Sequence, residues 1–170
     1  MKKAVIFFLC SSTLLFSQNK NIELNPKKSN SNDWYTITSL NQEGAFKLLF
    51  KANDLAEVLN KKIAIAILDA AGNTILMTAG DGVGPHNLLA AKRKAFTALS
   101  NKTSTLQLSR NAAANADTIN LNSLPELLLL GGGVPIIMNN NVIGSIGIAG
   151  AGGPEQDNLL AEQTIKIVNN

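Results

Sequence analysis

Two pairs of short apolar segments, each pair separated by a turn, constrain the fold more than any other feature of the sequence. In the first pair, residues 63–68 alternate isoleucine with alanine before ending in leucine, and residues 74–79 return after a turn. Gly72 supplies the positive φ angle that such a turn requires. In the second pair, residues 136–138 and 142–148 flank three asparagines, and asparagine tolerates the left-handed conformation of tight turns. The sequence therefore predicts two β-hairpins.

Helical periodicity surrounds these hairpins. Apolar residues recur at spacings of three and four between Ala45 and Leu59, which predicts a helix. Ser39 and Gln42 fit a capping box at the start of this helix. Further helices are predicted from His86 to Leu99, from a cap at Thr103 or Ser104 to Ala116, and from Pro154 toward Val168.

The order of these elements defines the expected fold class. Residues 34–37 are a candidate for a short extended segment, and residues 125–130 lead into a glycine-rich turn before the second hairpin. The resulting order, α-β-β-α-α-β-β-β-α, predicts an α+β domain with an antiparallel sheet of about five strands and flanking helices, a profilin-like layer architecture. Because the chain has only 170 residues, we expect one domain over residues 34–170.

The first seventeen residues have the pattern of a secretory signal peptide. Two lysines, Lys2 and Lys3, precede a mainly apolar run, and the small residue Ser17 stands just before Gln18, where polarity begins. We expect cleavage between Ser17 and Gln18, and a secreted or periplasmic location. Residues 18–33, rich in asparagine, lysine and serine, are predicted to form a flexible polar linker.

Two alternatives to a cleaved signal peptide are open. A membrane anchor would need about 20 apolar residues, and the run here is shorter. A lipoprotein would use Cys10, but this cysteine lacks the small preceding residue that lipidation normally needs, and the apolar run continues past it. Both alternatives are therefore weaker than export with cleavage.

Residue usage excludes several functions for the exported chain. The whole chain has 15 Lys+Arg and 12 Asp+Glu. Removing Lys2 and Lys3 leaves 13 against 12, a net charge of +1, which does not predict the basic surface of a nucleic-acid-binding protein. Cys10 is the only cysteine and His86 the only histidine. A chain that has lost Cys10 can form no disulfide and use no thiolate, and one histidine makes no multi-histidine metal site.

His86 is the main candidate for ligand binding. On a helix it shares one face with Ala90, Arg93 and Thr97, at i, i+4, i+7 and i+11. A flat anionic ligand fits such a face, with Arg93 or Lys94 near its carboxylates. For haem, the imidazole would bind the iron and the guanidinium a propionate. The alternative is a surface histidine that caps a helix, with the two cations on an ordinary solvated face.

Other motifs have ordinary structural explanations. The glycines of residues 147–153 lack the G-x-G-x-x-G spacing of a dinucleotide-binding turn. Asp69 fits a hairpin turn, and Glu155 and Asp157 fit the first turn of a helix, where the helix dipole favours negative charge. There is no G-x-S-x-G nucleophile motif. We therefore assign no catalytic residues.

Four segments in order carry a resemblance to a known family. They are residues 65–72, residues 82–86 with 93–98, residues 132–136, and residues 143–150. On these segments the chain resembles the GlcG/HbpS family, also described as the haem-degrading or PduO C-terminal-like domain, over about residues 36–168. The resemblance implies a small antiparallel sheet with flanking helices, and, as in the secreted members of the family, haem binding and assembly into oligomers.

The resemblance and the predicted signal peptide together favour a secreted or periplasmic haem-binding protein that scavenges haem, stores it or acts as a sensor accessory. We expect non-covalent b-type haem with His86 as iron ligand and with Arg93, Lys94 and Thr97 nearby. An oxygen of Thr97 or Tyr35 is the alternative ligand. The expected partners are further copies of the chain, and a membrane sensor protein is a candidate. The alternatives are an enzyme that oxidatively degrades haem or another tetrapyrrole, and a non-catalytic interaction module.

Overall fold

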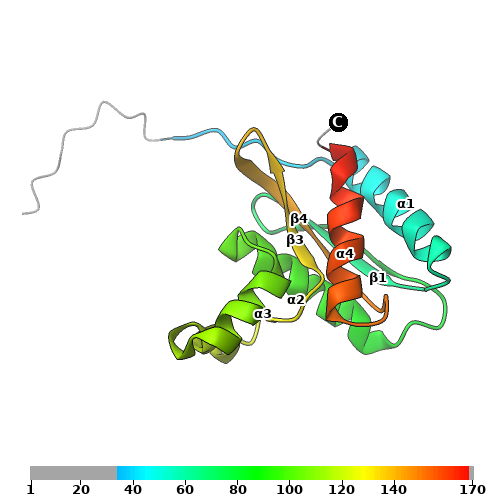
Figure 1. The fold of residues 1–170 in the computed structure, drawn as a ribbon. Coiled ribbons are helices and arrows are strands. Elements are labelled where there is room, and N and C mark those ends of the chain that lie inside the picture. Colours follow the sequence, from blue (N-terminus) through cyan, green and yellow to red (C-terminus); the bar gives the residue numbers. More distant parts are fainter. Residues whose placement is uncertain (1–33, 169–170) are drawn as a thin grey trace, which may run out of the picture. The chain divides into compact units, whose positions relative to one another are not determined.

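The computed structural model describes residues 34–168 (Figure 1). The predicted signal peptide and linker lie outside the described residues. Residues 36–168 lie in one compact unit. Within residues 34–168, no helix is both long and apolar enough to cross a membrane. The elements in chain order are α1 (Gln42–Val58), β1 (Ala64–Asp69), β2 (Thr74–Ala79), α2 (Pro85–Asn101), α3 (Thr105–Ala114), the 3-10 helix η1 (Ala116–Ser123), β3 (Gly133–Met138), β4 (Asn141–Ala149), α4 (Pro154–Ile165) and the 3-10 helix η2 (Lys166–Val168).

The strands form one antiparallel sheet in the order β2-β1-β4-β3. β1 pairs with β2 and β3 pairs with β4, so both predicted hairpins are confirmed. The hairpins join in the middle of the sheet, where Ala64 of β1 lies opposite Ala149 of β4. Asn139 and Asn140 turn the second hairpin with φ angles of 50° and 64°. Asparagine adopts this left-handed conformation more readily than most residues, which explains why a glycine is not needed there.

Helices cover both faces of the sheet, as the α+β prediction requires. α1 and α4 lie side by side on one face (Figure 1), where the isoleucines of β1 and β4 meet apolar residues of both helices. α2 packs on the other face against alanines of β1 and β4. The alternation of isoleucine and alanine along β1 thus sends large side chains toward two helices and small ones toward a single, closely packed helix. The result is three layers, with the sheet between helices.

The prediction of about five strands is wrong: the part of the chain that the structure describes has four. Residues 125–130 run beside α2 without joining the sheet. Their backbone groups bind side chains instead, because Arg93 donates to the carbonyl of Leu127, Thr97 Oγ1 accepts from the N–H of Leu128, and Thr105 Oγ1 donates to the carbonyl of Leu130. These bonds take the place of a strand ladder. Residues 34–37 form no strand either.

The predicted cap of the first helix is also wrong. The N-cap is Asn41, whose side-chain oxygen accepts from the N–H of Gly44 at 2.8 Å. Ser39 Oγ instead accepts from the N–H of Ala70 at 3.1 Å and ties the start of the domain to the β1–β2 turn. The predicted alternative cap at Ser104 is confirmed, since its hydroxyl accepts from the N–H of Gln107.

Candidate ligand site on α2

His86 lies exposed in the first turn of α2, directly after the N-cap Gly84 and Pro85. Its ring folds back over Gly84: a Cβ atom at that glycine would lie 2.9 Å from His86 Cε1 and 3.1 Å from Nδ1. Any larger residue at position 84 would therefore displace the imidazole. The glycine before the helix thus leaves the ring room at the surface, where its nitrogens are accessible to a ligand.

Arg93 and Thr97 lie farther along the same face of α2 and hold the segment before β3. Arg93 Nη2 donates to the carbonyl of Leu127. Thr97 is fully buried; its hydroxyl donates to the carbonyl of Arg93 at 2.7 Å and accepts from the N–H of Leu128 at 2.8 Å. Because the Thr97 hydroxyl both donates and accepts a hydrogen bond within the protein, it positions the backbone around the site and is not exposed at the surface.

Lys94 is not where the sequence interpretation placed it. Its side chain is 1% exposed, and its Nζ lies 2.7 Å from Asp157 Oδ2 and donates to the carbonyl of Ile148 at 3.0 Å. The expected position beside the carboxylates of a ligand is therefore wrong. The physical reason is helical geometry: residue 94 is one position past residue 93, about 100° around the helix, and this rotation turns it into the protein.

Two adjoining hollows flank the C-terminal half of α2, and Gly72 and Phe96 line both. One has a volume of about 550 Å³ and is lined by Leu68, Gly72, Thr74, Lys92, Arg93, Phe96 and Glu126. The other, of about 470 Å³, lies beyond Phe96 toward Leu99 and Val142. These volumes fall in the range of small-molecule sites. The first hollow combines an aromatic ring with two cations and one carboxylate, Glu126, so its charged lining is net positive, which suits a flat ligand that carries negative charge.

The turn between β1 and β2 forms one wall of these hollows and is fixed by Asp69. One carboxylate oxygen accepts from the backbone N–H of Ala71 at 2.9 Å and of Asn73 at 2.8 Å, and the other accepts from the Asn73 amide at 2.9 Å. Burial opposes the charge of this carboxylate, but the hydrogen bonds from Asn73 and Ala71 outweigh burial and hold the pKa of Asp69 below its ordinary value. The turn is therefore stabilised in the ionised state.

The structure brings together some of the predicted residues and adds others. Arg93 lines the first hollow, whereas His86 does not. The two residues are seven apart on one helix, roughly 10 Å along its axis. Lys92, Phe96 and Glu126 were not predicted as site residues. Phe96 could have been found as an exposed aromatic one turn after Arg93, but the position of Glu126 depends on the long connection after α3, which carries no periodic signal.

The fold and the hollows define a layered α+β domain with a candidate ligand site on the surface of α2. The chain belongs to the family described as haem degrading protein HbpS-like, whose model matches residues 40–166. The earlier resemblance is thereby confirmed.

Solved structures share the fold of this chain. A double mutant of HbpS from Streptomyces reticuli superposes with a TM-score of 0.75 and 31% identity, over 85% of this chain and 97% of that one. The PduOC:haem complex gives a TM-score of 0.70 and 26% identity, over 78% and 96%. The corrinoid adenosyltransferase PduO of Citrobacter freundii is 32% identical over 143 residues, covering 78% of this chain but only 42% of that protein. The chain thus matches less than half of PduO.

Proposed function

We propose that this protein binds haem along the exposed face of α2. The observation that carries the proposal is the arrangement on one helix of an exposed imidazole, His86, followed by a hollow lined by Arg93, Lys92 and Phe96. A relative of the same fold is a haem complex, which supports the same ligand. The haem would be of b type, held without covalent bonds, because the described residues include no cysteine to attach it.

The residues of this face have distinct roles in the proposal. His86 would supply a nitrogen ligand to the iron. Arg93 and Lys92 would meet propionates, and the Phe96 ring would contact the porphyrin. Thr97 is a positioning residue, since its hydroxyl fixes Leu128 and so the segment that carries Glu126. Lys94 stabilises the position of α2 through its buried ion pair with Asp157 of α4. Bound haem supplies an iron centre that can take up a further ligand or change its oxidation state.

Export and self-association complete the proposal. The signal-peptide pattern of residues 1–17 supports a secreted or periplasmic protein that scavenges, stores or senses haem. Several large exposed apolar side chains on α1 support a homo-oligomer, because exposed apolar patches are typical of protein interfaces. They include Phe46 and Phe50, whose rings stack with centroids 6.5 Å apart, and Val58, which is 84% exposed. A membrane sensor protein remains a candidate partner.

The first test is a titration of the purified protein with haemin. The expected result is a Soret band that shifts from that of free haemin and saturates at a fixed ratio of haem to protein. A spectrum that stays that of free haemin at every ratio would contradict haem binding and favour an interaction module instead.

The second candidate function is haem degradation, which the description of the family favours. The same titration separates the two functions when an oxidant such as hydrogen peroxide is added. A binding protein keeps its Soret band or loses it in proportion to the protein present. An enzyme bleaches haem over many turnovers and releases an open-chain product.

A further inference from the structure

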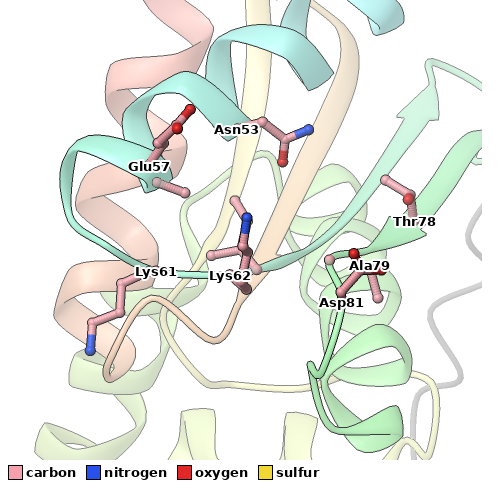
Figure 2. Close-up of a pocket in the computed structure, with 10 residues that line it drawn as sticks. Asn53, Glu57, Lys61, Lys62, Thr78, Ala79 and Asp81 are labelled. Carbon is pink, nitrogen blue, oxygen red and sulfur yellow. The ribbon is translucent and has the colours of Figure 1, made fainter.

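A third hollow lies away from the α2 site, between the end of α1 and the end of β2 (Figure 2). Its volume is about 360 Å³. None of its lining residues also lines the hollows around Phe96. The lining residues are Asn53, Ala56 and Glu57 of α1, Lys61, Lys62 and Ile63 of the connection to β1, Thr78 and Ala79 of β2, and Gly80 and Asp81 of the following loop.

Backbone hydrogen bonds fix the frame of this hollow. The N–H of Lys61 donates to the carbonyl of Ala56 at 2.9 Å, which closes the end of α1. The N–H of Gly80 donates to the carbonyl of Ile63 at 2.9 Å, which joins the loop after β2 to the connection between α1 and β1. The polar side chains are therefore attached to a defined backbone, although most of them are exposed at the rim.

The two lysines at this site point in different directions. Figure 2 shows the Lys62 amine directed into the space between α1 and β2, with Asn53 on one side and Thr78 on the other. The Lys61 amine points away from this space. It runs toward Gly152, where an added Cβ would lie 3.9 Å from Lys61 Nζ. Both lysines line the hollow, but Lys62 is the one whose amine is directed into it.

Opposite charges surround the hollow without pairing to each other. Glu57 and Asp81 supply carboxylates and Lys62 an ammonium, yet within residues 34–168 the ion pairs are Lys47–Glu43 and Lys94–Asp157. Because these carboxylates and this ammonium form no ion pair with each other, all of them can contact a bound molecule. Such a molecule needs an anionic group for Lys62 and a cationic group for the carboxylates. The apolar lining of Ala56, Ile63 and Ala79 suits a short aliphatic part.

We propose that this hollow binds a small zwitterionic amino carboxylate. Its carboxylate would be held by the Lys62 ammonium, with the Asn53 amide and the Thr78 hydroxyl as further donors. Its ammonium would contact one of the two carboxylates, Glu57 or Asp81, which lie on opposite sides of Lys62 (Figure 2). This site is independent of the α2 site, so either proposal can fail without the other.

The test measures binding of defined probes to the full exported protein by titration calorimetry and by NMR chemical shifts. The zwitterionic probes are glycine, β-alanine and γ-aminobutyrate, which differ in the distance between their charges. Acetate and ethylammonium carry one of the two charges each. We expect at least one zwitterion to bind saturably, and both single-charge probes to bind roughly tenfold more weakly or worse, because each loses one charge-assisted contact. No saturation by any zwitterion up to roughly 50 mM would overturn the proposal.

Variants identify the site. Lys62→Gln and the double variant Glu57→Gln with Asp81→Asn should each weaken binding of the best zwitterion by roughly tenfold or more. Lys51→Gln removes the same charge from a lysine of α1 that does not line the hollow, and should leave affinity unchanged. Equal affinity in Lys62→Gln and the wild type, or an equal loss in Lys51→Gln and Lys62→Gln, would overturn the assignment. Circular dichroism and haemin titration of each variant confirm that the rest of the molecule is intact.

Discussion

Lys94 Nζ lies 2.7 Å from Asp157 Oδ2 in the interior, where the pair joins α2 to the first turn of α4. Each partner has a second bond: Lys94 donates to the carbonyl of Ile148, and Asp157 Oδ1 accepts from the N–H of Ala151 at 2.7 Å. Gly132 packs directly against both, since a Cβ there would lie 2.8 Å from Asp157 Cβ and 3.0 Å from Lys94 Nζ. The two charges are thus enclosed, and each has a second hydrogen bond besides the ion pair.

Removing one charge of this pair should destabilise the protein strongly. Lys94→Met leaves the Asp157 carboxylate buried without a counter-charge, and we expect a loss of about 3–5 kcal/mol in the free energy of unfolding. Urea denaturation measures the change. The double variant Lys94→Met with Asp157→Asn removes both charges and should recover part of the loss. A single-variant cost below about 1 kcal/mol would show that the pair is not enclosed as described.

The contact between β4 and α2 depends on Gly147. A Cβ atom at this residue would lie 1.9 Å from the carbonyl oxygen of Ala91 and 2.7 Å from the N–H nitrogen of Ala95. Both are backbone atoms of a helix, so they cannot move aside as a side chain can. Gly147→Ala should therefore cost about 3 kcal/mol or more, measured as a lower midpoint of thermal unfolding.

Gly80→Ala is the matched control for this substitution. Its Cβ would meet Lys62 Cβ at 3.3 Å, a side-chain contact that relaxes with a small shift. We expect a change of at most about 1 kcal/mol. Similar costs for the two variants would contradict the close approach of α2 to β4.

The Asp69 turn should make stability depend on pH in a defined direction. The folded protein holds the pKa of this carboxyl below its ordinary value of 3.8. Its contribution is therefore fully present above about pH 4 and is lost as the pH falls through the lower folded value. Asp69→Asn should be less stable than the wild type at neutral pH, by about 1 kcal/mol or less because the turn is partly exposed. The difference should shrink as the pH falls below about 4.

Unfolding midpoints measured between neutral and acid pH check this prediction. Asn73→Ala removes the side-chain donor and should reduce the same pH-dependent difference. A deficit in Asp69→Asn that stays constant down to the lowest pH would contradict a role for the ionised carboxylate.

Export with cleavage predicts a mature chain that begins at or near Gln18 and contains no thiol, because Cys10 leaves with the signal peptide. Mass spectrometry of the exported protein measures its N-terminus. A mature form that retains Cys10 would contradict cleavage at Ser17 and support an anchor or a lipoprotein.

Local sequence patterns predicted the parts of the fold that local physics determines. The isoleucine–alanine alternation of β1 and the asparagines between β3 and β4 indicate hairpins, because strand alternation and turn conformation are properties of neighbouring residues. The count of strands failed because the backbone of residues 125–130 binds Arg93, Thr97 and Thr105, which are distant in sequence. The sequence of residues 125–130 does not by itself indicate these long-range partners.

In the candidate site, too, the sequence predicted what local spacing determines and missed what long-range contacts determine. Helical spacing correctly places His86 in the first turn of α2 and Arg93 farther along the helix. It does not show that Lys94 points inward, since that requires Asp157, which lies 63 residues later. Glu126 reaches the hollow only through the connection after α3. Spacing predicts the face of a helix, and tertiary packing determines which of its charges stay accessible.

The Soret spectrum of His86→Ala is the most direct test of the proposed haem site. We expect the variant to bind haemin more weakly than the wild type and with a shifted Soret maximum, because a ligand to iron sets its electronic state. Arg93→Ala should lose about 1–3 kcal/mol of binding free energy with a smaller spectral change, since a propionate contact contributes only charge and hydrogen bonding. Arg110→Ala, on α3, should match the wild type. An unchanged maximum and affinity in His86→Ala would contradict the account.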